Sequence, residues 1–147
     1  MKYTLILDDT KEESIVITVH KKTEIIEQIE KIICKETFSL FGFVNDDIVP
    51  LDFPSVYVFY TSDNKVYAKT KDETYLLRER LYQIEEHLTE DFIKINQGCI
   101  INLKKVLKFE TNFNASIKVV LKNGFSDFIS RRELKNVKRR IGLWKNI

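Results

Sequence analysis

Two neighbouring side-chain amides, Asn96 and Gln97, interrupt an otherwise apolar stretch of the sequence, DFIKINQGCIIN at residues 91–102. Side-chain amides can form paired hydrogen bonds with the edge of an adenine in the major groove of DNA. Together with Gly98, the same residues are also typical of a hairpin turn between two buried strands. Lys94 adds a positive charge just before the amides. The sequence leaves open whether this stretch reads a base or only turns the chain.

A second polar group lies at residues 130–133, Ser-Arg-Arg-Glu, which have the S-x-x-E form of a capping box. Ser130 is expected to accept a hydrogen bond from the backbone of Glu133, while the Glu133 side chain reaches back to the start of the helix. Arg131 and Arg132 would then lie in the first helical turn, where free N–H groups favour acidic side chains. Because residues that violate a local preference often serve function, the two arginines suggest that an anion binds there.

Charge is distributed unevenly along the 147 residues, although the net charge is only +2. Residues 1–90 contain 11 Lys and Arg against 18 Asp and Glu, a net charge of −7, whereas residues 91–147 contain 13 against 4, a net charge of +9. This asymmetry predicts an anionic partner for the C-terminal part, nucleic acid above all. The alternative is that the two parts neutralise each other within one fold.

The sequence contains none of the common catalytic or cofactor-binding motifs, such as a P-loop, GxGxxG, GxSxG or HExxH. His20 and His87 lie far apart, and Cys34 and Cys99 share neither a metal-binding nor a redox spacing. The sequence therefore predicts a protein that is not an enzyme and uses no cofactor or metal. Because no apolar run approaches the roughly 20 residues that span a bilayer, and the start does not form a secretory signal, it also predicts a cytoplasmic protein.

Hydrophobic periodicity predicts a mostly β (α+β) fold of antiparallel strands with a few short helices. Strand-like runs occur at residues 3–7, 14–19, 38–43, 47–53, 55–61, 65–70, 106–110 and 115–121, and on both sides of the Asn96-Gln97 pair. The dipeptide Asn123-Gly124 is a strong hairpin signal. Helical spacing is found in three sets of apolar residues: Ile25, Ile26, Ile29, Ile32 and Ile33; Leu77, Leu81, Ile84 and Leu88; and Leu134, Val137, Ile141 and Trp144.

The first 36 residues are predicted to form a separate strand–strand–helix element before the domain at residues 38–147. One face of its helix is almost entirely isoleucine, which is too apolar to remain in contact with water. We expect this face either to form a homodimer or to pack on the rest of the chain, with the homodimer favoured.

Several segments taken together and in order resemble a known family, the LytTR-type DNA-binding domain. They are VYVFYTSDNKVYAKT at 56–70, FIKIN at 92–96, IINLKKV at 100–106, and NG at 123–124 with ISRR at 129–132. The match runs over roughly residues 40–143. It implies a compact, mostly β domain that places loop residues into successive major grooves of double-stranded DNA, in a bacterial transcription regulator. Short stand-alone members lack a receiver domain, and the family suggests that they answer to a membrane protein encoded nearby.

The resemblance implies a set of DNA-binding residues in three segments. They are Asn64 and Lys65; Lys94, Asn96 and Gln97; and Ser130, Arg131 and Arg132, with Lys105 and Lys135 as further cations. For Asn64, a turn-forming role is an equal alternative, since Asn is favoured in turns. Where the family usually has a serine, this chain has Gly98, so the hydroxyl is missing. Asn102 is expected to be structural, with its amide bonded to the backbone.

Two other functions are weighed against a sequence-specific DNA-binding transcription regulator. An RNA or single-strand binder would need exposed aromatic side chains for base stacking, and the tyrosines and phenylalanines near residues 57–67 fit a core equally well. A protein-interaction module would explain the isoleucine face but not the basic C-terminal part. The sequence favours DNA binding.

Overall fold

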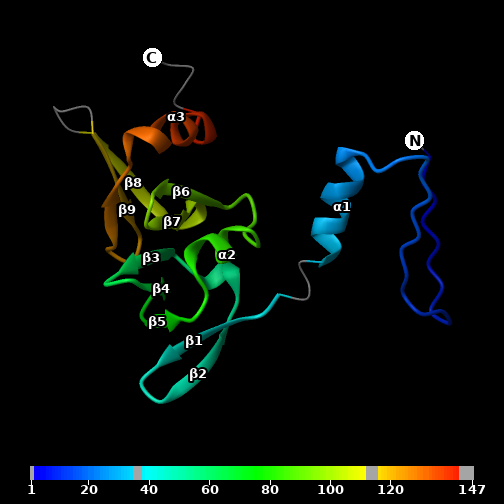
Figure 1. Ribbon diagram of the computed structural model, residues 1–147, viewed down its shortest axis with the longest axis horizontal. Coiled ribbons are helices and arrows are strands. Elements are labelled where there is room, and N and C mark those ends of the chain that lie inside the picture. Colours follow the sequence, from blue (N-terminus) through cyan, green and yellow to red (C-terminus); the bar gives the residue numbers. More distant parts are fainter. Residues whose placement is uncertain (1, 35–37, 112–115, 143–147) are drawn as a thin grey trace. The chain divides into compact units, whose positions relative to one another are not determined.

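The computed structural model describes residues 2–34, 38–111 and 116–142, and Figure 1 shows their helices and strands. The chain divides into two compact units, Met1–Glu36 and Thr37–Ile147. Among the described residues, strands occur only in the second unit.

The N-terminal unit contains helix α1 (Glu24–Cys34), which confirms the helix predicted from the isoleucine spacing. The strands predicted at residues 3–7 and 14–19 are wrong, since no strand is assigned in the described part of the chain before α1. The turn between them does form, because Asp8 Oδ1 accepts hydrogen bonds from the Thr10 N–H at 3.0 Å and the Thr10 hydroxyl at 2.6 Å. Two extended segments alone are only marginally stable as a hairpin, so β-branched residues are not sufficient to form a ladder here.

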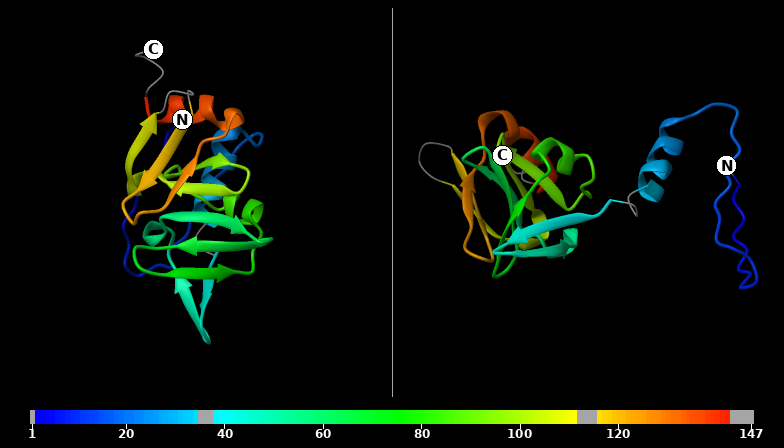
Figure 2. Two further views of the ribbon diagram at one scale, coloured as in Figure 1. Left: turned by 90° about the vertical axis from the view of Figure 1, so that its left-hand side faces the viewer. Right: turned by 60° about the horizontal axis from the view of Figure 1, so that its bottom comes forward.

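The C-terminal unit is built on a seven-stranded antiparallel sheet with the strand order β2-β1-β5-β4-β3-β7-β6. The strands are β1 (Leu40–Val44), β2 (Asp47–Leu51), β3 (Val58–Ser62), β4 (Lys65–Lys69), β5 (Thr74–Leu77), β6 (Phe92–Asn96) and β7 (Cys99–Asn102). The β1–β2 hairpin projects from one end of this sheet (Figure 2). Short 3₁₀ turns, η2 (Phe53–Ser55) and η3 (Leu103–Lys105), lead into β3 and out of β7.

A second, three-stranded sheet has the order β10-β9-β8, with β8 (Val106–Thr111), β9 (Ile117–Leu121) and β10 (Ser126–Phe128). The predicted Asn123-Gly124 turn joins β9 to β10, and Gly124 has a φ of 90°, a conformation that glycine adopts without strain. Helix α3 (Arg131–Arg140) follows and includes Leu134 and Val137 of the predicted basic helix. Trp144, placed on the same face by the sequence, lies outside the described residues. The fold is mostly antiparallel β with a few short helices, as predicted.

The helix predicted around residues 77–88 is much shorter than expected. Leu77 ends strand β5, which pairs with β4 in the register Tyr67↔Leu76 and Val66↔Leu77. Only Leu81–Glu85 form helix α2. A short apolar run does not distinguish strand from helix, and pairing with an available strand edge determines the outcome at residues 74–77.

The long sheet is covered on both faces around β3, β6 and β7, which explains why these strands are apolar on both sides. One face packs against β9 and α3 in a core of Tyr57, Val58, Ile93, Ile95, Cys99, Ile101, Ile117, Val119, Leu121, Ile129 and Val137. The other face packs against α2 in a core of Leu40, Val56, Phe59, Val66, Ala68, Leu77, Leu81, Ile84, Phe92 and Ile100.

Asn102 is a buried polar residue at the end of β7, with 2% of its surface exposed. Its Nδ2 donates a hydrogen bond to the Val56 carbonyl at 3.0 Å, and its Oδ1 accepts one from the Lys104 N–H at 3.0 Å. These bonds confirm that Asn102 is structural and that its amide bonds to the backbone.

We predict that Asn102→Ala lowers the free energy of unfolding by about 2–3 kcal/mol, because it leaves the buried Val56 carbonyl and the Lys104 N–H without their partner. Urea denaturation, with the slope m compared between variants, measures this change. Gln97→Ala, at an exposed position, is the control and should change stability by less than about 0.5 kcal/mol. Equal midpoints for the two variants would contradict the prediction.

Candidate nucleic-acid interface

The turn between β3 and β4 consists of Asp63 and Asn64, since Ser62 pairs with Lys65. Both turn residues have positive φ, 51° for Asp63 and 62° for Asn64. Type I′ hairpin turns require this conformation, and Asn and Asp tolerate it better than other non-glycine residues. The turn-forming role of Asn64 is therefore confirmed, while a base contact by its exposed amide stays a prediction.

The KINQG segment also forms a hairpin. Asn96 pairs with Cys99 across β6 and β7, so Gln97 and Gly98 are the turn residues, and the register shifts between Lys94 and Asn96. Such an irregularity bends a strand and redirects its side chains. The hairpin interpretation is confirmed, and it does not exclude a contact with a base, because Gln97 is exposed at the tip.

Gly98 packs closely against Thr61 of β3, which leaves no room for a side chain at position 98. The Gly98 carbonyl accepts a hydrogen bond from the Thr61 N–H at 2.9 Å. A Cβ atom added to Gly98 would overlap Thr61 Oγ1. A larger residue at position 98 would therefore require Thr61 to move, and the Thr61 hydroxyl occupies the space beside the turn.

Asn96 is held by hydrogen bonds within the protein. Its Nδ2 donates to Asp127 Oδ2 at 3.0 Å and to the Phe128 carbonyl at 3.0 Å, both in β10. Its Oδ1 accepts from the Gly98 N–H at 2.9 Å. Because both amide hydrogens are used within the protein, Asn96 helps to position the turn, and a contact of this residue with a base stays a prediction. Gln97 forms no hydrogen bond with another described residue and is the amide that remains available.

The start of α3 is attached to the same hairpin. Ser130 is the N-cap of α3, and its hydroxyl accepts a hydrogen bond from the Glu133 N–H at 3.4 Å. The reciprocal half of the predicted capping box is wrong, because the Ser130 N–H donates to the Ile95 carbonyl of β6 at 2.8 Å. This bond brings the first turn of α3, with the exposed side chains of Arg131 and Arg132, next to the β6–β7 turn.

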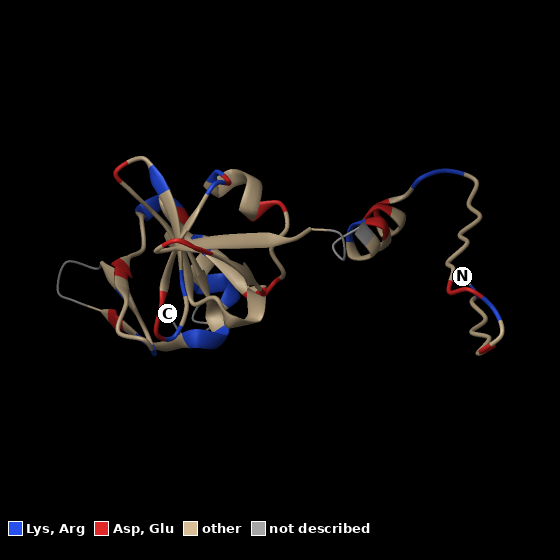
Figure 3. Ribbon diagram, turned by 90° about the horizontal axis from the view of Figure 1, so that it is seen from below, with Lys and Arg blue, Asp and Glu red and all other residues tan. Residues whose placement is uncertain are grey.

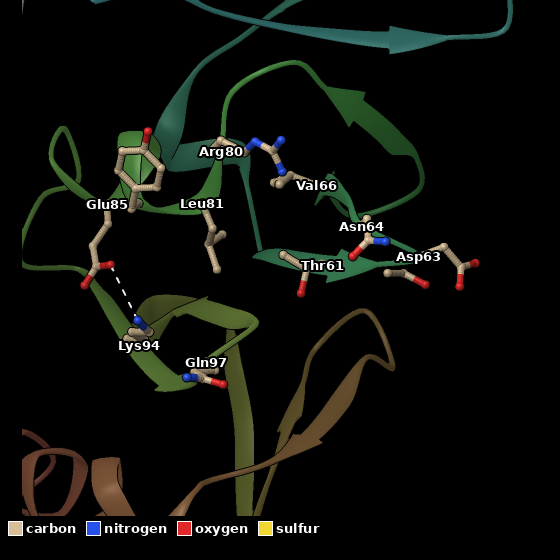
Figure 4. A pocket seen from close by; sticks show the side chains of 11 residues that line it. Thr61, Asp63, Asn64, Val66, Arg80, Leu81, Glu85, Lys94 and Gln97 are labelled. Atoms are coloured by element: carbon tan, nitrogen blue, oxygen red, sulfur yellow. Dashed lines mark ion pairs between the residues drawn. The ribbon is translucent and has the colours of Figure 1, made fainter.

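Two adjoining hollows connect the three predicted segments on one surface. The first has a volume of about 730 Å³, and its lining includes Asn64, Lys94 and Gln97. The second, of about 460 Å³, is lined by Lys94, Asn96, Gln97, Ser130, Arg132 and Glu133. Lys94 and Gln97 line both hollows, so the β6–β7 hairpin borders each of them. Figure 4 shows the side chains that line the first hollow.

The other predicted cations lie outside these two hollows. Lys65 follows Asn64 at the start of β4, and Arg131 is exposed beside Arg132. Lys105 is held over the ring of Tyr57, with its Nζ 5.1 Å from the ring centroid. Lys135 is exposed on α3. Figure 3 colours the ribbon blue at Lys and Arg, including those of α3.

Sequence reasoning missed several residues that line the first hollow, among them Thr61, Arg80 and Glu85. Lys94 Nζ lies 3.9 Å from Glu85 Oε2 in this hollow. No local pattern identifies these residues, because Arg80 and Glu85 belong to a segment that the sequence assigned to a longer helix. Only the packing of α2 against β3 and β4 places them beside the β6–β7 turn.

The described residues contain little that could support other chemistry. Burial and the neighbouring Asp127 carboxylate raise the pKa of the Cys99 thiol, so this free cysteine stays neutral. The described side chains form no group of His, Cys, Asp and Glu that could hold a metal ion. No helix in the described part of the chain is long and apolar enough to cross a membrane.

A β scaffold that exposes polar and basic side chains on three loops is typical of a nucleic-acid-binding domain. The family model of the LytTr DNA-binding domain matches residues 46–142. Since this match covers more than half of the sequence, the chain belongs to the LytTR family, and the resemblance noted in its motifs is confirmed.

Related proteins and a solved structure agree with this assignment. Two Staphylococcus aureus proteins, from strains NCTC 8325 / PS 47 and MRSA252, are each named an uncharacterized HTH-type transcriptional regulator. Each is 29% identical to this chain over 108 residues, which is 74% of this chain and 74% of the relative. A LytTr DNA-binding domain from Bacillus cereus has the same fold, with a TM-score of 0.66 and 19% identity, over 71% of this chain and 98% of that domain.

The two roles of Asn64 can be separated by comparing Asn64→Ala with Asn64→Gly. Alanine at a φ of 62° is strained, so Asn64→Ala should lower the free energy of unfolding by about 1 kcal/mol, whereas Asn64→Gly should not. Both variants remove the amide. If Asn64 contacts a base, both should lose affinity for the preferred duplex to the same extent, as measured by fluorescence anisotropy. Wild-type affinity of the glycine variant would show that Asn64 only forms the turn.

Proposed function

We propose that this protein is a transcription regulator that binds double-stranded DNA in a sequence-specific manner. In this proposal, Asn64, Gln97 and Arg132 enter successive major grooves. The observation that carries it is the pair of adjoining hollows, which bring one polar side chain from each of three distant loops onto one continuous surface. Side chains that read bases must be held in register, and the hydrogen bonds around Asn96 and Ser130 provide this support.

The two arginines of α3 are assigned different roles. Arg132 lines the second hollow together with Gln97, while Arg131 does not. We therefore assign Arg132 to a base, since arginine is the usual bidentate partner of guanine, and Arg131 to a phosphate. Lys65 and Lys135 add positive charge on the elements that carry these readers, and contacts of this kind fix the register of a protein on DNA.

The aromatic side chains at residues 57–67 favour double-stranded DNA over single strands. Tyr57 and Phe59 are buried in the two cores. Tyr60 and Tyr67 stack on each other with centroids 5.5 Å apart, and Tyr60 also contacts the ring of Phe125. Rings that already pack against one another offer little open surface for stacking bases.

The DNA-reading proposal is tested by binding-site selection with the wild type, Gln97→Ala and Lys94→Ala. Gln97→Ala should lose about 1–3 kcal/mol of binding free energy, concentrated at particular base pairs. Lys94→Ala should weaken binding to all duplexes about equally and reduce the salt slope by about one unit.

Ser14→Ala is a control, because Ser14 is an exposed polar residue in the other unit of the chain and lies outside α1. It should leave both affinity and sequence preference unchanged. If Gln97→Ala and Ser14→Ala select the same sequences with the same affinity, Gln97 is only a turn residue. Binding that is insensitive to salt, or no binding to any duplex, would contradict the proposed function as a whole.

We also propose that α1 mediates a homodimer. Within the N-terminal unit, Ile25, Ile32 and Ile33 are 55%, 66% and 43% exposed, which leaves an apolar face without a partner in that unit. A symmetric dimer would bury this face and would suit two half-sites separated by about one turn of DNA, ~10 bp.

The homodimer predicts a mass of twice 17.4 kDa in analytical ultracentrifugation at micromolar concentration. Ile32→Glu should shift the protein to the monomer, because it places a charge in the apolar contact. Glu30→Gln, at an exposed position of the same helix, is the control and should leave the mass unchanged. A wild-type protein that sediments only as a monomer would exclude the dimer.

A further inference from the structure

The first hollow contains charged groups that the assignment of base-reading residues does not use. It lies between the β3–β4 turn, the start of α2 and the β6–β7 turn. Figure 4 shows the Arg80 side chain on one side of the hollow and Lys94 with Gln97 on the opposite side, with Thr61 between them. Two cations thus face the same space from different elements.

The backbone of Arg80 is fixed, while its side chain is exposed. Its N–H donates a hydrogen bond to Gln83 Oε1 at 2.8 Å, and its carbonyl accepts bonds from the N–H groups of Gln83 and Ile84 at 3.0 and 3.2 Å. Among the described residues, no carboxylate forms an ion pair with the Arg80 guanidinium. The adjacent Glu79 does not neutralise Arg80 through its buried Oε2, because this atom has no hydrogen-bond partner. The Arg80 backbone is therefore fixed beside the hollow, and its exposed guanidinium is available to an anion.

The position of the hollow indicates which anion fits. It separates Asn64 from Gln97, the proposed readers on two different loops. A DNA strand that passes between two such readers presents its sugar–phosphate backbone to the space between them. A planar guanidinium can bind phosphate oxygens in a bidentate manner, and the Thr61 and Ser62 hydroxyls, which also line the hollow, can donate further hydrogen bonds.

We propose that the hollow between Asn64 and Gln97 binds the DNA backbone, with Arg80 and Lys94 holding phosphate groups from opposite walls. This inference rests on the proposed function and adds Arg80 as a residue that binds a phosphate and so positions the DNA backbone. Glu85 opposes the phosphate in the same space. In the absence of DNA it pairs with Lys94 at 3.9 Å, and DNA binding must separate this pair.

The inference is tested by comparing Arg80→Gln with Arg78→Gln in the full chain. Both changes remove one positive charge two residues apart, but the Arg78 guanidinium lies over the ring of Phe43, 4.7 Å from its centroid, and Arg78 does not line this hollow. Arg80→Gln should weaken binding to all duplexes about tenfold at low salt, reduce the salt slope by about one unit and leave the selected sequence unchanged. Arg78→Gln should change affinity less than about twofold and keep the wild-type slope.

A second pair of variants is expected to change DNA affinity in the opposite direction. Glu85→Gln should tighten binding to all duplexes about threefold, because it removes a carboxylate that faces the phosphate and releases Lys94. Glu86→Gln is the control, since Glu86 is exposed and does not line the hollow. Circular dichroism of each variant checks that the fold is kept, and the Glu85 pair tests the inference independently of any change at Arg80.

The possible failures are distinguishable. If the wild type binds duplex DNA and its affinity falls with rising salt, but Arg80→Gln matches Arg78→Gln and Glu85→Gln matches Glu86→Gln, this inference is wrong and the proposed function stands. If the wild type binds no duplex, the proposed function fails and this inference fails with it. A change in the selected sequence on Arg80→Gln would also overturn it, because Arg80 would then contact a base.

Discussion

The interface depends on a small set of hydrogen bonds that attach the β6–β7 turn to β10 and α3. The Ser130 N–H donates to the Ile95 carbonyl at 2.8 Å, and the Asn96 amide donates to Asp127 and Phe128. These bonds join the long sheet to the segment that carries Arg132. Gln97 and Arg132 lie on elements that are far apart in sequence. Without these hydrogen bonds, the two elements could shift relative to each other. Because each bond is made by a backbone group or by a short side chain, the distance between the two proposed readers is closely fixed.

The third loop is coupled to the same turn from the other side. The Thr61 N–H donates to the Gly98 carbonyl at 2.9 Å, and the Thr61 hydroxyl fills the space that a side chain at position 98 would need. Strand β3 then leads directly into the turn that holds Asn64 at positive φ. Beneath these turns, β3 and β7 are apolar on both faces and pack into two cores. The polar surface is thus supported by a rigid centre, which is the arrangement that a site for base recognition requires.

Two chemically equivalent amides therefore serve different purposes in adjacent positions. Asn96 uses both amide hydrogens within the protein, whereas Gln97 is exposed at the tip of the turn. The same division applies to the cations. Lys105 lies over the ring of Tyr57, while Arg80 and Lys94 face a hollow between two loops. Residue type and charge alone do not separate a supporting residue from a binding one, since the difference lies in which hydrogen-bonding groups remain unused.

The sequence by itself determined the features that arise from local patterns. Alternating apolar residues indicated most strands, Asn123-Gly124 and Asp63-Asn64 indicated their turns, and Ser130 marked the start of α3, because these signals act over a few residues. The LytTR motifs also indicated the loops of the proposed interface. Only the tertiary structure decided the rest. Residues 74–77 became a strand because the edge of β4 was available, and residues 3–7 and 14–19 did not form strands although their composition favours them. The packing of α2 brought Arg80 to the hollow, and β10 took up the hydrogen bonds of Asn96. These outcomes depend on which segments pair and pack in the folded chain, and a local pattern contains no information about that.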